Sequence, residues 1–109
     1  MFPDEIVIYL EKEGNECKLT LVYRFHNNID LEKAQEFHLN RIKHIIRRQI
    51  PPPVLKYRSG IVPDEKEVRI EIFGSRVDVL NFLWREMKQH AIDEMMKTKR
   101  KNLFYPWVF

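Results

Sequence analysis

The sequence predicts an α+β fold, a two-layer sandwich in which a four-stranded, mainly antiparallel sheet carries two long helices on one face. Hydrophobic residues alternate with polar ones in four short stretches, as in half-buried strands, and recur at helical spacing in two longer ones. These stretches follow the order strand, strand, helix, and the order then repeats (ββαββα), which indicates an internal pseudo-repeat. At 109 residues the chain corresponds to one domain, residues 1–109, with half-units 1–50 and 54–109.

The first half begins with a predicted hairpin. Residues 5–10 and 18–25 each place alternate hydrophobic side chains on one side of an extended chain. Between them, Gly14 and Asn15 are typical of a tight turn. We therefore expect two antiparallel strands.

A helix is predicted over residues 31–49. Asn28 or Asp30 can cap its start by accepting hydrogen bonds from unpaired backbone amides. The three prolines at 51–53 end it, because proline lacks an amide donor and disfavours helical geometry in the preceding residue.

The second half has the same predicted order. Residues 54–58 and 67–73 are predicted strands, joined by the loop SGIVPDEKE. Ser75 and Asp78 fit a capping box for a helix that starts near Val77. The predicted core stripe of this helix is Leu80, Leu83, Trp84, Met87, Ala91 and Met95.

Composition limits the classes of function. The net charge of +3 and the pI of about 9.1 permit contact with nucleic acid or another anionic surface. Cys17 is the single cysteine, which excludes an intrachain disulfide and favours a reducing, cytoplasmic location. The first residues resemble neither a signal peptide nor a membrane span. Scarce alanine and serine beside abundant isoleucine and lysine suggest an AT-rich genome, that of a thermophile or one of its viruses.

The stretch 37–63 is the main functional candidate, because it holds six basic residues and no acid. Several cations that follow a groove can bind successive phosphates, each with release of a counterion. The alternative is that cations at a helix C-terminus only complement the helix dipole. The predicted phosphate contacts at the helix end and the next strand are Arg41, Lys43, His44, Arg47, Arg48, Lys56 and Arg58.

The sheet face that the helices leave open is a second candidate surface. Alternation assigns to it Val7, Tyr9, Lys18, Thr20, Val22, Arg24, Lys56, Arg58, Arg69, Glu71 and Phe73. Tyr9 and Phe73 could stack on bases while Arg24 and Arg69 hold the backbone. The alternative is a homodimer interface.

The C-terminal residues NLFYPWVF form an aromatic tail. Such a tail would be an exposed apolar patch if it did not pack. Phe104, Tyr105, Trp107 and Phe109 are therefore predicted either to contact a partner or to pack on the chain's own core.

No cofactor, metal site or catalytic group is predicted. Glu86, His90 and Glu94 share one helical strip, but the outer two lie about 12 Å apart by helical rise, too far to share one ion. We interpret this strip as exposed helix surface. The predicted function is binding of DNA or RNA by a non-enzymatic homodimer, without a membrane; the alternative is a protein-interaction module that uses the open sheet face and the aromatic tail.

Overall fold

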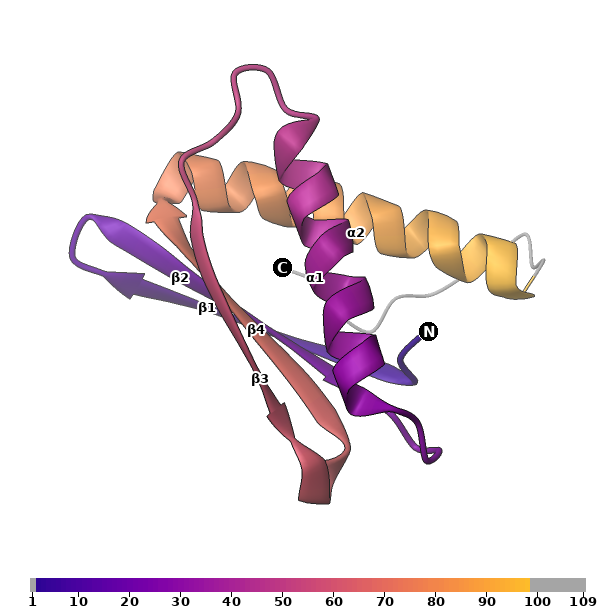
Figure 1. Cartoon of the computed structure of the whole chain (residues 1–109). Coiled ribbons are helices and arrows are strands. Elements are labelled where there is room, and N and C mark those ends of the chain that lie inside the picture. Colours follow the sequence, from indigo (N-terminus) through magenta and orange to yellow (C-terminus); the bar gives the residue numbers. More distant parts are fainter. Residues whose placement is uncertain (1, 99–109) are drawn as a thin grey trace.

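The computed structural model describes residues 2–98 and contains a four-stranded antiparallel sheet and two helices (Figure 1). The α+β class and the antiparallel sheet predicted from the sequence are thus confirmed. A single 3-10 turn, Pro63–Glu65, joins the third and fourth strands. The elements in chain order are β1 (Glu5–Glu13), β2 (Glu16–Arg24), α1 (Leu31–Arg47), β3 (Lys56–Val62), β4 (Glu67–Ser75) and α2 (Arg76–Thr98).

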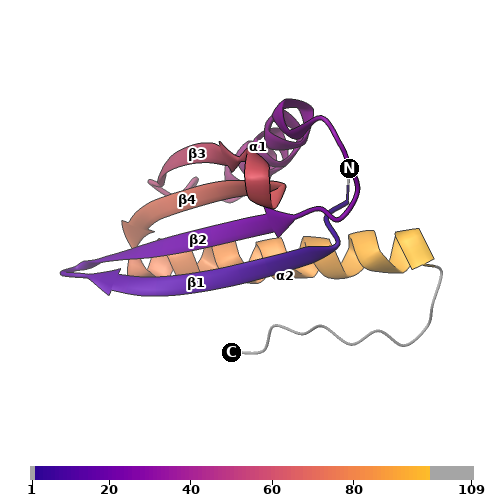
Figure 2. The same cartoon turned by 90° about the horizontal axis from the view of Figure 1, so that it is seen from below.

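The strands lie in the order β1-β2-β4-β3, so that β2 and β4 form the centre of the sheet. Leu21 of β2 stands opposite Ile70 of β4, and both side chains are fully buried. In the view of Figure 2 the helices lie behind the strands, and α1 contacts β3 and β4 while α2 contacts β2 and β4. The hydrophobic core fills the space between these inward side chains and the helices.

Helix α1 begins where a side chain can cap it. The carboxylate of Asp30 accepts hydrogen bonds from the backbone N–H groups of Glu32 and Lys33, as the sequence predicted for one of two candidates. Its core face consists of Ala34, His38, Ile42 and Ile45. The helix ends at Arg47, two residues before the predicted end at Gln49, because the chain leaves helical geometry ahead of the prolines.

Strand β3 corrects one predicted boundary. It begins at Lys56 and runs through Ser59 and Gly60 to Val62, although this segment was predicted to be a loop after Arg58. Its residues pair with β4 over their whole length, with Val62 opposite Glu67. Ser59 and Gly60 are typical of turns, but hydrogen bonds to the backbone of β4 keep this segment in a strand.

Helix α2 corrects the predicted core stripe. Val79, Phe82, Leu83 and Glu86 are buried, whereas Trp84 is 71% exposed. Leu80 is also exposed, and Met87 packs at the edge of the core. Both sets fit helical spacing, and the sheet selects the face one residue away from the predicted one. Ala91 and Met95 lie outside the side chains that the structure describes.

The junction between β4 and α2 contains a helix cap and a close approach of residues 54 and 55. Ser75 accepts a hydrogen bond from the backbone N–H of Asp78, as predicted for the cap. At Gly74 an added Cβ would lie 2.5 Å from Cδ2 of Leu55 and 3.1 Å from the carbonyl oxygen of Val54. Glycine therefore allows residues 54 and 55 to pass close to the end of β4.

Candidate nucleic-acid interface

The C-terminal end of α1 presents its basic residues to solvent. His44 and Arg47 occupy the last turn, Arg48 is the C-cap, and all three are exposed. Lys43 is half-buried because its ammonium group lies 5.7 Å from the ring centre of Tyr57 in β3. Within the part of the chain whose side chains are described, none of these four forms an ion pair with a carboxylate.

Arg41 does not share this surface. Its side chain is 13% exposed and forms an ion pair with Glu86 of α2 at 2.5 Å. The hydroxyl of Tyr23 donates a hydrogen bond to the same Oε1 atom, and its ring stacks on His38 at 4.2 Å. The charge of Arg41 is therefore balanced inside the protein and is not presented to a ligand.

Glu86 is fully buried, so the prediction that it lies on an exposed strip of α2 is wrong. Burial raises the pKa of Tyr23 well above its ordinary value, and the negative charge of Glu86 raises it further. Tyr23 therefore keeps its proton and remains a hydrogen-bond donor to Glu86. The side chains of His90 and Glu94 are outside the described set, and the described residues contain no group of three or more His, Cys, Asp or Glu that could hold a metal ion.

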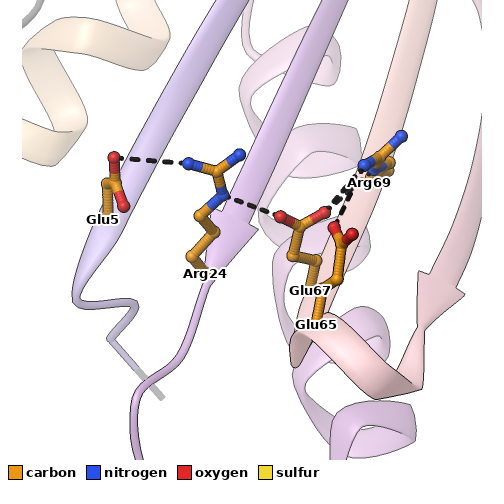
Figure 3. A network of polar contacts seen from close by, with 5 residues as sticks. All are labelled: Glu5, Arg24, Glu65, Glu67 and Arg69. Carbon is orange, nitrogen blue, oxygen red and sulfur yellow. Dashed lines mark hydrogen bonds and ion pairs between the residues drawn. The ribbon is translucent and has the colours of Figure 1, made fainter.

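The open sheet face carries a continuous network of ion pairs (Figure 3). Arg24 of β2 lies between Glu5 of β1 and Glu67 of β4, at 3.4 Å and 2.7 Å. Arg69 of β4 donates to Glu67 at 2.9 Å and contacts Glu65 at 3.6 Å. Glu67 is 2% exposed beneath these two guanidinium groups.

A second group of ion pairs lies further along the same face. Glu71 accepts hydrogen bonds from Arg58 of β3 and forms an ion pair with Lys18 of β2. The same two cations lie near the ring of Phe73, 5.3 Å and 6.0 Å from its centre. Tyr9, the other predicted stacking residue, is 48% exposed.

These contacts change the pKa of both central acids. Burial alone raises the pKa of Glu67, but hydrogen bonds from Arg24 and Arg69 outweigh it and lower the pKa below its ordinary value. Hydrogen bonds from Arg58, followed by Lys18, lower the pKa of Glu71. Both acids therefore stay ionised near neutral pH and balance the cations of this face.

Apart from Arg41, the predicted phosphate contacts of the stretch 37–63 belong to two surfaces. Tyr57 points toward α1, where it meets Lys43, so alternation places Lys56 and Arg58 on the opposite face of the sheet. Lys56 is exposed and makes no ion pair with the described side chains, whereas Arg58 is held by Glu71. The helix end and the open sheet face therefore point in different directions.

Two cations of α2 also lie near the helix end, although the sequence pattern did not indicate them. Arg85 and Lys88 line a hollow of about 540 Å³ together with Gln49 and Trp84, beside the end of α1. Both cations lie on the exposed side of α2. This side cannot be identified from the sequence until the buried face of the helix is known.

Phe104, Tyr105, Trp107 and Phe109 of the aromatic tail lie outside the described residues. No described helix is long and apolar enough to cross a membrane. Comparison of the chain with family models, with curated proteins and with solved structures found no match.

Proposed function

We propose that the protein binds nucleic acid, DNA or RNA, through the C-terminal end of α1. The observation that supports this proposal is the contrast between two sets of cations. Arg24, Arg58 and Arg69 on the sheet face are balanced by acids, whereas Arg47 and Arg48 are exposed and meet no acid among the described side chains. A phosphate that approaches the helix end displaces only solvent and counterions, but on the sheet face it must compete with a carboxylate.

The helix dipole alone does not account for this surface. One or two cations complement a helix C-terminus, each by roughly 0.3 to 1 kcal/mol. Here Lys43, Arg47 and Arg48 are joined by Arg85 and Lys88 across the neighbouring hollow. The proposal takes the protein as a two-layer sandwich with both helices on one face of the sheet, so that these cations share one side of the molecule. A cytoplasmic location fits the single buried thiol of Cys17.

The test is a salt titration of a double charge reversal, Arg47→Glu/Arg48→Glu. Each neutralised phosphate contributes roughly −0.7 for single strands and −0.9 for duplexes to the slope of log K against log salt. We expect the variant to bind labelled oligonucleotides more weakly and with a slope shallower by about 1.4 to 1.8.

The matched control is Lys12→Glu/Lys33→Glu, which changes the net charge equally at two exposed lysines of β1 and of the opposite end of α1. It should keep most of the slope of the unmodified chain. Equal slopes for the unmodified chain and the helix-end variant would refute the proposal, as would no binding in about 50 mM salt.

A second candidate function is assembly with another copy of the chain through the open sheet face. The observation that favours it is the alternation of charge across this face, with Arg24 between acids and Glu71 between bases, around a shallow hollow of about 360 Å³. Such a pattern can complement itself about a two-fold axis. On this proposal Tyr9 and the aromatic tail also contribute partner contacts.

The assembly proposal predicts a dimer mass in sedimentation analysis. Replacing Tyr9 with lysine should convert the dimer to a monomer, because this change adds an unbalanced charge at an exposed position of the open sheet face. Lys33→Glu should leave the mass unchanged. A monomer mass for the unmodified chain at all concentrations would exclude this candidate.

A further inference from the structure

The hollow between the proline loop and α2 combines two cations of the proposed phosphate-binding surface, Arg85 and Lys88, with an amide and an aromatic ring that the helix-end proposal does not use. It is lined by Gln49, Pro51 and Pro53 from one side and by Trp84, Arg85 and Lys88 from the other. Its volume of about 540 Å³ lies in the range of sites that hold one small ligand. One acid, Asp78, lines it as well, so its formal charge remains positive.

Gln49 is the first indication that the hollow binds something. Its side chain is 7% exposed, yet Nε2 has no hydrogen-bond partner in the described part of the chain. Buried amide groups are almost always hydrogen-bonded, because an unpaired one loses its contact with water without compensation. Nε2 itself is buried, so a ligand oxygen can accept a hydrogen bond from it only after the Gln49 side chain turns toward the hollow that it lines.

Trp84 is the second indication. The indole is 71% exposed, although tryptophan is normally a largely buried residue. It lies on the wall of a hollow and not on a convex surface, with Arg85 next to it in sequence and Lys88 one turn further along the helix. A flat apolar ring beside two cations suits a ligand that is itself planar at one end and anionic at the other.

Arg85 and Lys88 are available for such a ligand. Neither forms an ion pair with any side chain that the structure describes, in contrast to the cations of the sheet face. A single-strand binding site needs an aromatic ring on which a base stacks, cations for the backbone, and a hydrogen-bond donor for a carbonyl or phosphate oxygen.

We propose that this hollow binds one nucleotide of a single strand, with its base on Trp84, its phosphates at Arg85 and Lys88, and an oxygen at Nε2 of Gln49. This inference rests on the proposed function and narrows it from nucleic acid in general to single strands. A duplex fits the site poorly, because its bases already stack on one another and present only their edges. The strand would continue from the hollow to Arg47 and Arg48, which directly precede Gln49.

The experiment uses the full chain with Trp107→Phe, which makes Trp84 the only tryptophan. It is titrated with oligothymidylate of about 15 nucleotides and with a duplex of the same length, and both tryptophan fluorescence and ligand anisotropy are followed. We expect the single strand to quench Trp84 and to bind more tightly than the duplex, which should leave the fluorescence unchanged.

Three substitutions in the Trp107→Phe background test the residues. Trp84→Ala should weaken single-strand binding roughly 5- to 150-fold, and Trp84→Phe should retain most of it. Gln49→Met should weaken binding while the midpoint of urea unfolding stays the same or rises, since it removes an unpaired buried amide. If Gln49 had only a structural role, its substitution would lower both the affinity for the oligonucleotide and the midpoint of urea unfolding. Leu10→Ala, at an exposed hydrophobic position of β1, is the control and should bind normally.

The outcomes separate this inference from the proposed function. In one outcome, binding depends on salt but Trp84 fluorescence does not change, and Trp84→Ala binds as tightly as its parent. This result would overturn the proposal that the hollow binds a nucleotide and would leave the helix-end proposal intact. If the oligonucleotide quenches Trp84 equally in Arg47→Glu/Arg48→Glu, the hollow binds the strand and the helix end is excluded as a binding site. Quenching only by a proline-rich or acidic peptide, and not by the oligonucleotide, would assign the hollow to a protein partner and overturn the inference.

Discussion

Burial of individual charged residues decides which of them can act outside this molecule. Arg41 and Arg48 are seven positions apart on one basic helix end, yet only Arg48 is exposed. Arg41 instead points into the interface between the helices, where Glu86 and Tyr23 surround it. The sequence could place both on a helix but could not assign their partners, because the acid that binds Arg41 lies 45 positions away in the chain.

The Arg41–Glu86 pair leads to a prediction about stability. Removing one partner leaves the other charge buried without compensation, so Arg41→Met and Glu86→Leu should each lower the free energy of unfolding by about 3 to 5 kcal/mol. The double variant should be more stable than either single variant, because no uncompensated charge remains. Urea unfolding of all four chains measures this coupling, and losses that simply add would show that the two side chains do not interact.

Whole strands and helices show a similar division between what sequence patterns predict and what they cannot. Alternation in β2 and β4 correctly separated the inward residues Leu21 and Ile70 from the outward residues Arg24 and Arg69. It could not reveal that Arg24 would cover Glu67, because this contact depends on the register between two strands distant in sequence. In α2 the apolar residues fitted two neighbouring faces equally well, and only contact with the sheet distinguishes them.

The charge network that joins β2 and β4 predicts a loss of stability in acid. The folded pKa of Glu67 lies below its ordinary value of 4.5, so its ion pairs stabilise the fold fully above that pH. This contribution is lost as the pH falls through the folded pKa. Glu67→Gln should therefore lower stability near neutral pH and flatten its decline between about pH 5 and pH 2.

Glu16→Gln serves as the control for this measurement, since Glu16 is exposed at the start of β2 and makes no ion pair with a described side chain. Urea unfolding at a series of pH values should give nearly the same pH profile for this variant and for the unmodified chain. If the free energy of unfolding of Glu67→Gln fell as steeply in acid as that of the unmodified chain, groups other than Glu67 would determine the loss of stability.

At the level of the whole molecule, the two half-units are joined through the middle of the sheet. Each half contributes one edge strand, one central strand and one helix, and the central strands β2 and β4 pair over nine residues each. Tyr23 and Arg41 from the first half both contact Glu86 from the second. The α+β class was predictable from the sequence, but the pairing of the central strands depends on long-range contacts that no local pattern encodes.

This arrangement predicts that the halves fold only together. A two-stranded hairpin with one helix is at best marginally stable alone, and each half would expose the inward face of its central strand. Polypeptides 1–50 and 51–109 should each give circular dichroism spectra of largely unfolded chains. An equimolar mixture should recover helical signal and sediment as a complex. Leu21→Asp in the first polypeptide should abolish this recovery, because the residue is fully buried opposite Ile70. Cooperative thermal unfolding of either polypeptide by itself would contradict the prediction and make that half an independent domain.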